Sequence, residues 1–192
     1  MTDPRSLTRR DFLLAAGAAT TVPAILGVTR RLARSANAAD VLADVKIVEF
    51  TDAGVRKGLV TVPKVVKSDD AWKSQLHDEL TFAVARKGGT ERPFSGAYWN
   101  EHRKGLFRCV CCDTALFSST AKFDSGTGWP SYWQPIAEEN VKHGDPSGGF
   151  TNSEVTCRRC DAHLGDLFND GPKPTGLRYC IDSVSLKFIP AE

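Results

Sequence analysis

The sequence has 192 residues, enough for one domain with a hydrophobic core and some additional segments. The formal net charge of +2 is unevenly distributed, because residues 1–38 contain six arginines and two aspartates, which leaves about −2 for the rest of the chain. A weakly acidic main body without a basic stripe offers no electrostatic basis for nucleic-acid binding, so we expect no nucleic-acid partner.

Residues 1–38 have the order of a targeting signal. Arg9 and Arg10 directly precede an apolar run over residues 12–28, and Ala36 and Ala38 then provide small residues for a signal peptidase. The arginine pair predicts export by the twin-arginine route to the periplasm or cell exterior, with cleavage after Ala38. The alternative is a retained membrane anchor, although glycine and proline interrupt the apolar run and it is short for a membrane span. Cleavage would leave no stable membrane association.

Residues 39–67 are expected to form an N-terminal extension. Alternating apolar residues and the turn-like sequence at 51–54 predict strand, turn and strand over residues 45–66, ending near Pro63. This pattern indicates a β-hairpin appended to the main domain, residues 68–192, and it carries no obvious chemistry.

A helical pattern follows the hairpin. Ser68 is a suitable helix start, and Trp72, Leu76 and Leu80 are spaced to share one helix face. Residues 79–85 are compatible with a continuation of this helix, which Gly88-Gly89 would end.

From Arg92 onward the sequence is rich in glycine, proline, aromatic residues and short apolar runs. Such a composition is typical of a β-domain with ordered loops. The strand candidates are residues 106–109, 149–151, 154–157 and 183–188.

Four of the six cysteines form two Cys-x-x-Cys pairs. Two such turns can close a tetrahedral thiolate cage around Zn²⁺, and four protein ligands leave no open position, so we predict a structural zinc site. Disulfides are the alternative for an exported protein, but a bridge within Cys-x-x-Cys closes only a very small loop. Because 44 residues separate the two pairs, the metal would join distant segments of one domain. The predicted ligands are Cys109, Cys112, Cys157 and Cys160.

The remaining cysteines are Cys111 and Cys180. Arg178 would share a strand face with Cys180, and a nearby guanidinium lowers the pKa of a thiol and raises its reactivity. A buried structural cysteine is the alternative reading of Cys180.

Several collinear motifs resemble the B-type, R-specific methionine sulfoxide reductases. They are residues 157–188, with Gly-Leu-Arg-Tyr-Cys at 176–180; Gly-Thr-Glu-Arg-Pro-Phe-Ser-Gly at 89–96; and residues 123–131, with Gly-Thr-Gly-Trp-Pro-Ser at 126–131. Together they span roughly residues 70–190 of the chain. The resemblance implies a mainly β fold in which two twisted antiparallel sheets surround a shallow basin, with short N-terminal helices and zinc at the four paired cysteines.

The resemblance also implies roles for individual residues. Cys180 would be the nucleophile, Trp129 the wall that receives the methylthio group, His163 a polar partner of the sulfoxide, and Arg178 a hydrogen-bonding residue that favours the thiolate. A thiolate can attack the electrophilic sulfoxide sulfur while a donor neutralises the oxygen, giving methionine and a sulfenic acid that thiols then reduce. The expected substrates are oxidised proteins or peptides, and the expected reductant is a thioredoxin-like exported protein.

Three positions depart from the usual family pattern. Thr127 occupies the position that often holds a resolving cysteine, which leaves Cys111 or an external thiol for that role. Asp166 and Asp182 stand where histidine and asparagine are usual, and two carboxylates near Cys180 would disfavour its thiolate. A carboxylic acid with a raised pKa at Asp166 could instead donate to the sulfoxide oxygen. The rival hypothesis is therefore a zinc-stapled β-fold binding module with weak or lost reductase activity.

Overall fold

The computed structural model describes residues 43–144 and 153–191. The predicted export signal and the strand candidate at 149–151 therefore lie outside the described residues. Within the described ranges, no helix combines the length and apolar character needed to cross a membrane.

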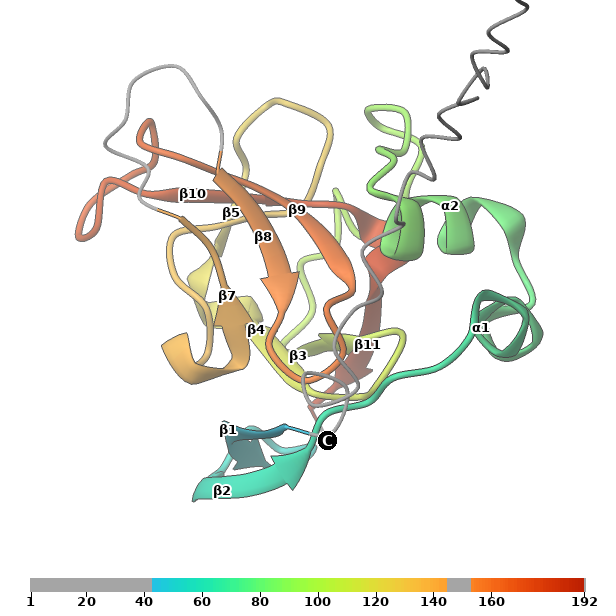
Figure 1. The fold of residues 1–192 in the computed structure, drawn as a ribbon. Helices are drawn as coiled ribbons and strands as arrows, with labels where there is room; N and C mark the ends of the chain where they lie inside the picture. The colour runs from blue at the N-terminus through green and yellow to red at the C-terminus, as the bar shows by residue number, and fades with distance from the viewer. Residues whose placement is uncertain (1–42, 145–152, 192) are drawn as a thin grey trace, which may run out of the picture. The chain divides into compact units, whose positions relative to one another are not determined.

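The main body contains two antiparallel sheets (Figure 1), as expected for a mainly β fold. The larger sheet has six strands in the order β5-β6-β10-β9-β8-β7, and the smaller has three in the order β11-β3-β4. The larger sheet comprises β5 (Lys122–Phe123), β6 (Ser131–Tyr132), β7 (Val141–Lys142), β8 (Ser153–Cys157), β9 (His163–Phe168) and β10 (Arg178–Ile181). The smaller comprises β3 (Gly105–Cys109), β4 (Ala115–Ser118) and β11 (Leu186–Pro190), and the 3-10 helices are η1 (Ser119–Ala121), η2 (Glu138–Asn140) and η3 (Ser183–Ser185).

An aromatic cluster joins the two sheets. Phe107 and Phe117 come from the smaller sheet, Tyr132 and Tyr179 come from the larger one, and all four are buried. The rings of Phe117 and Tyr132 stack with their centroids 4.4 Å apart, and Phe107 meets Tyr132 edge-on at 5.3 Å. Burial of these large side chains supplies much of the hydrophobic stabilisation that holds the sheets together.

The helical segment is divided into α1 (Asp69–Leu76) and α2 (Glu79–Lys87), so the predicted continuation of a single helix is wrong. His77 adopts a left-handed conformation with φ of 55° and ends α1, and the Asp78 side chain accepts a hydrogen bond from the Thr81 N–H to begin α2. This break reorients the second helix. Trp72 is buried as predicted, but Leu80 is 47% exposed and Phe82 packs inward in its place.

The predicted strand, turn and strand near the N-terminus are present as β1 (Asp44–Phe50) and β2 (Arg56–Pro63), which pair in antiparallel fashion. The buried side chain of Asn140 attaches this hairpin to the main body. Asn140 accepts a hydrogen bond from the Val48 N–H and donates to the carbonyls of Val48 and Ala115. A fully satisfied buried amide therefore attaches β1 of the hairpin to the main body.

The strand candidates at 106–109 and 154–157 are confirmed as β3 and β8. The candidate at 183–188 is only partly correct, because η3 occupies its first three residues and β11 begins at Leu186. The alternation of residues 183–186 resembles a strand, but the Ser185 N–H donates to the Asp182 carbonyl and closes a turn instead. Sequence patterning alone did not identify β9 or β10, the two strands that carry His163, Asp166, Arg178 and Cys180.

Candidate functional site

The candidate site lies where β9 and β10 pair. Cys180 on β10 is directly opposite Asp166 on β9, so their side chains point to the same face of the sheet. Gly165 precedes Asp166 with φ of 146°, and a Cβ at this position would overlap the carbonyl oxygen of Cys180. Only glycine therefore allows the two strands to approach this closely beside the thiol.

Cys180 opens into a hollow of about 120 Å³. Apolar surface comes mainly from the rings of Trp129 and Phe168, and the polar groups come from two carboxylates and one hydroxyl. The lining residues are Thr90, Trp129, Gly165, Asp166, Phe168, Cys180 and Asp182. An apolar wall beside a thiol, with a few polar groups, is suited to a small thioether-like group.

The Cys180 thiol is subject to opposing influences. Burial raises its pKa above the usual value, the Arg178 charge and a hydrogen bond from Thr127 lower it, and the carboxylates of Asp182 and Asp166 raise it. The net direction is upward. The sequence-based expectation that two carboxylates would disfavour the thiolate agrees with this direction.

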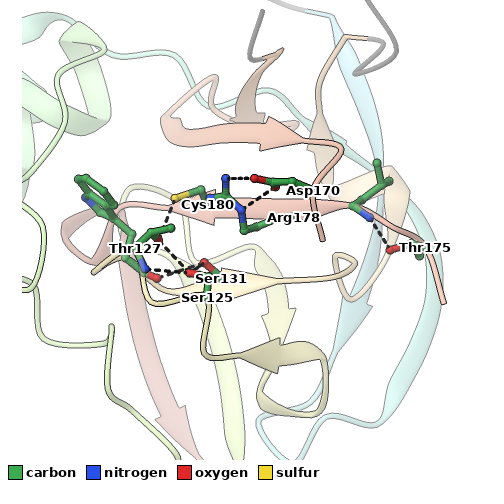
Figure 2. Close-up of polar contacts among 9 residues, drawn as sticks. Ser125, Thr127, Ser131, Asp170, Thr175, Arg178 and Cys180 are labelled. Carbon is green, nitrogen blue, oxygen red and sulfur yellow. Dashed lines mark hydrogen bonds and ion pairs between the residues drawn. The ribbon is translucent and has the colours of Figure 1, made fainter. Parts of the chain in front are cut away.

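A chain of hydroxyl groups ends at the Cys180 sulfur (Figure 2). Ser131 Oγ lies 2.7 Å from Ser125 Oγ, Ser125 Oγ lies 2.8 Å from Thr127 Oγ1, and Thr127 Oγ1 lies 4.0 Å from Cys180 Sγ. Each hydroxyl in the chain can accept from one neighbour while donating to the next. Thr127 Oγ1 is thus within hydrogen-bonding reach of the Cys180 sulfur, and either group can be the donor.

Arg178 is held rigidly on the same strand. Its Nε and Nη2 groups donate to the two carboxylate oxygens of Asp170, each at 2.8 Å, in the forked geometry seen in Figure 2. Its guanidinium also lies 4.2 Å from the ring centre of Phe168. The ion pair lowers the pKa of Asp170 and raises that of Arg178, so Arg178 is a fixed positive charge beside Cys180.

Asp182 is the buried acid of the site. The carboxyl is 2% exposed, and burial raises its pKa to about 7, against a smaller opposing effect of the hydrogen bond that Oδ1 accepts from the Glu91 N–H. The second oxygen, Oδ2, lies 3.7 Å from Nε2 of His163. Nδ1 of His163 contacts a Glu154 carboxylate oxygen at 2.8 Å, so the imidazole connects the buried acid to a more exposed one.

Glu91 links Asp182 to Trp129. Its carboxylate accepts hydrogen bonds from the N–H groups of Ser183 and Val184, and its carbonyl accepts one from the Trp129 indole at 3.1 Å. The Glu91 N–H also donates a hydrogen bond to Asp182. Glu91 therefore positions both the acid and the indole wall of the hollow. The sequence signal for Glu91 was its place in the 89–96 motif; nothing in its local pattern indicated burial.

The structure brings most of the predicted site residues together. Cys180, Asp166, Asp182 and Trp129 line the hollow, whereas His163 touches Asp182 without lining it, and Arg178 lies beside Cys180. The contributions of Asp170 and Thr127 to the charge and hydrogen bonding at the thiol were missed, because neither lies at a spacing that predicts contact.

Cys111 lies in a different place. It is 4% exposed, packs in the hydrophobic core, and belongs to the first Cys-x-x-Cys turn rather than to the lining of the hollow. The Cys111 carbonyl accepts a hydrogen bond from the side chain of Gln75 at 2.7 Å.

The four paired cysteines form one cluster at the ends of β3 and β8. Their sulfur atoms all lie within 4.8 Å of one another, with 3.6 Å between those of Cys109 and Cys160 and 3.5 Å between those of Cys112 and Cys157. A zinc ion bound by four thiolates at about 2.3 Å holds its sulfurs roughly 3.8 Å apart. The cluster therefore has the size of a tetrahedral metal site, and the four residues can hold a metal ion.

Both turns of the cluster have the same backbone design. The Asp113 N–H donates to the Cys109 carbonyl and the Asp161 N–H donates to the Cys157 carbonyl, each at 2.9 Å. Both aspartates adopt a left-handed conformation, with φ of 63° and 52°. This repeated turn presents two sulfurs to one point from each segment, as the Cys-x-x-Cys spacing predicts.

The sequence comparisons agree with this geometry. The SelR domain family matches residues 77–190. A protein named peptide methionine sulfoxide reductase MsrB, from Herminiimonas arsenicoxydans, is 56% identical over 126 residues, which cover 65% of this chain and 91% of the relative. Proteins of the same name from Pseudomonas aeruginosa (strain UCBPP-PA14) and Agrobacterium fabrum are 55% and 51% identical, over 67% and 68% of this chain and 98% and 97% of the relatives.

A domain match over more than half of the chain, relatives matched over nearly their full length, and a thiol-containing hollow separate from a four-cysteine cluster all lead to one assignment. This chain belongs to the SelR-domain family of peptide methionine sulfoxide reductases, MsrB, and is an oxidoreductase of that class.

Proposed function

We propose that this enzyme reduces the R epimer of peptide-bound methionine sulfoxide, with Cys180 as the nucleophile. The observation that carries the proposal is the partly buried Cys180 thiol, which opens into a hollow with an indole wall and a protonatable acid. The four cysteines of the metal cluster do not line this hollow. Cys180 is therefore available for chemistry while the other thiols are used in structure.

The reaction begins with attack of the Cys180 sulfur on the sulfoxide sulfur, while a proton is delivered to the sulfoxide oxygen. The sulfur–oxygen bond of the substrate then breaks and the oxygen passes to Cys180 as a sulfenic acid. The substrate sulfur gains two electrons and leaves as methionine, and the cysteine sulfur loses two. Arg178 and Thr127 support the thiolate during this step, since both lower the pKa of Cys180.

Asp182 is the proton donor that the geometry favours. It lines the hollow, and its pKa is raised to about 7, so a substantial fraction of the carboxyl groups carry a proton near neutral pH. The alternative donors are Asp166, which also lines the hollow, and His163, which contacts Asp182 rather than the hollow.

Trp129 and Phe168 provide the surface for the methyl group. The indole N–H of Trp129 is already bonded to the Glu91 carbonyl, so this side chain offers the substrate an apolar surface rather than a donor. A sulfoxide whose methyl group rests on this surface and whose oxygen faces Asp182 presents only one epimer correctly to Cys180.

An external thiol recycles the enzyme in this proposal. All six cysteines lie in the described residues, and Cys111 is buried beside the metal cluster. A thiol from outside therefore condenses with the sulfenic acid to give a mixed disulfide and water, and a second thiol releases Cys180. With export by the twin-arginine route, the reductant is a thioredoxin-like protein of the same compartment, and the substrates are oxidised exported proteins or peptides.

The metal ion in this proposal is zinc, held by Cys109, Cys112, Cys157 and Cys160. Four thiolates suit zinc best and leave no ligand position for substrate, so its contribution is to folding.

The decisive experiment is isomer-resolved reduction of a methionine sulfoxide peptide by the chain from residue 39 onward, with dithiothreitol as reductant. We expect consumption of the R epimer alone, and no consumption by Cys180→Ser. A Cys111→Ser variant should retain single-turnover reduction, because Cys111 does not line the hollow. If wild type and Cys180→Ser consume equal amounts, the nucleophile is wrong; if neither epimer is consumed although peptide binds, the binding-module alternative is correct.

A further inference from the structure

The N-terminal hairpin segment, residues 44–66, precedes the part of the chain that matches the SelR domain. The catalytic hollow contains none of its residues. Besides the attachment at Asn140, its polar contacts include Arg108, which precedes the first Cys-x-x-Cys turn, and residues of the second turn. This distribution indicates a function connected with the metal centre.

Arg108 connects the hairpin to the first turn. Its guanidinium donates to the carbonyl of Asp113, directly after Cys112, and to the carbonyl of Phe50 at the end of β1, both at 3.0 Å. It also forms an ion pair of 2.9 Å with Asp52. The Arg108 side chain is 9% exposed, so its hydrogen bonds to the two carbonyls are shielded from water, whereas Asp52 is 75% exposed and its ion pair contributes less.

The last residues of the segment connect to the second turn. The N–H of Val65 donates to the carbonyl of Arg159, between Cys157 and Cys160, at 2.8 Å. The ammonium of Lys64 lies 2.6 Å from a carboxylate oxygen of Asp161, the residue after Cys160. The hairpin segment therefore holds both halves of the metal site by independent contacts.

The hairpin also controls the approach to one ligand. Cys109, Cys157 and Cys160 are buried, whereas Cys112 is partly exposed. Cys112 lines a hollow of about 460 Å³ whose other wall is formed by hairpin residues, among them Ile47, Phe50 and Lys57. A competing chelator that attacks the least buried thiolate would pass between the hairpin and this turn.

We propose that residues 44–66 act as a clamp that holds the two cysteine turns together and slows loss of the metal ion to competing chelators. The inference rests on the proposed zinc site. It gives the extension a function separate from catalysis, namely retention of the metal ion.

The experiment measures the rate at which the zinc-loaded full domain, residues 39–192, releases metal to an excess of a chromogenic pyridylazo chelator. Arg108→Met keeps the apolar stem and removes the contacts to Asp113, Phe50 and Asp52, and we expect release to be at least about ten-fold faster. Arg103→Met is the matched control, because Arg103 is 69% exposed and pairs with Glu101 instead; its release rate should equal that of wild type.

A second variant tests the other turn and is expected to destabilise the fold less than Arg108→Met. Lys64→Met removes the ion pair with Asp161 and should accelerate release by about two- to three-fold. The expected effect is small because both side chains of the pair are partly exposed to solvent. Lys46→Met, which changes an exposed lysine of the same hairpin, is its control and should have no effect.

A general loss of stability is distinguished by Leu177→Ala, which destabilises the core away from the hairpin and the turns. The clamp is supported if the Arg108 and Lys64 variants release metal faster than Leu177→Ala at an equal free energy of unfolding. It is refuted if they release metal at the wild-type rate, or only as fast as their lowered stability accounts for. A wild-type protein that contains no zinc would refute the proposed zinc site itself.

Discussion

At the scale of single residues, the reactivity of Cys180 depends on a balance between burial and two favourable contacts. Burial raises the pKa of the thiol, while Arg178 and Thr127 lower it. Arg178 is already neutralised in part by its forked pair with Asp170. The contact between Thr127 and Cys180 is weaker than the effect of Arg178, but it also favours the thiolate. It therefore influences the fraction of Cys180 that is ionised at neutral pH.

We expect Thr127→Val to raise the pKa of Cys180, because valine has nearly the same shape but no hydroxyl to donate. The rate of sulfoxide reduction at neutral pH should fall by about three- to ten-fold, the effect of one weak hydrogen bond. The measurement is the pH dependence of Cys180 alkylation by iodoacetamide, followed by peptide mass spectrometry. Thr127→Ser retains the hydroxyl and should alkylate like wild type; an unchanged pH profile for valine would exclude the contact.

Asp182 gives the fold a pH-dependent stability. Its pKa rises from 3.8 in the unfolded chain to about 7 in the folded one, so the folded state binds the proton more tightly. The resulting stabilisation is complete below about pH 3.8 and is lost as the pH rises through about 7. In the Asp182→Asn variant this dependence is absent, and the Glu91 N–H still has an oxygen acceptor.

Between about pH 5.5 and about pH 8, the free energy of unfolding of wild type should fall by about 2 kcal/mol more than that of Asp182→Asn. Urea denaturation of the two zinc-loaded proteins at both pH values measures this difference. Metal binding also depends on pH, but it does so equally in both proteins and is removed when they are compared. Parallel pH dependence of the two proteins would show that Asp182 is ionised over the whole range.

At the scale of elements, the break between α1 and α2 is the clearest departure from the helical pattern. The apolar spacing of Trp72, Leu76 and Leu80 is that of one continuous helix, but a single left-handed residue, His77, redirects the chain. A histidine in this conformation is strained relative to glycine, and its exposed side chain contributes little packing in return.

Replacing His77 with glycine should therefore stabilise the domain by about 0.5–1 kcal/mol. Alanine at the same position has no such freedom and should be neutral or destabilising. Thermal unfolding of the two variants beside wild type provides the test. A lower melting temperature for His77→Gly would mean that flexibility gained by the unfolded chain outweighs the relief of strain.

An element can be predicted from sequence when the residues that determine it are close together in the chain. The Cys-x-x-Cys turns, the hairpin and the N-terminal end of α1 depend on residues within a few positions, and the sequence predicted them. The burial of Glu91 and the Arg178–Asp170 pair depend on strands that meet only in the folded chain, such as β9 beside β10. Leu80 was misplaced for the same reason, because its exposure is decided by the direction of α2 after the break.

At the scale of the whole molecule, the proposed function assigns structure and chemistry to different cysteines. The four-cysteine cluster joins the end of β3 in the smaller sheet to the end of β8 in the larger one, so a metal ion held there would connect the two sheets. Cys180 lies on β10, in the hollow beside Trp129, where oxidation and reduction can proceed without opening the cluster. This separation predicts that stability and activity respond to different substitutions.

We expect Cys157→Ser to abolish zinc binding and to lower the free energy of unfolding by several kcal/mol, since metal binding and folding are coupled. Cys180→Ser should retain one zinc per chain and wild-type stability while losing turnover. The measurements are zinc content by atomic emission and urea denaturation of both variants. Removing zinc from wild type with a chelator should reproduce the stability loss of Cys157→Ser. If the metal-free protein kept the stability of the loaded one, the cluster would not hold the two sheets together.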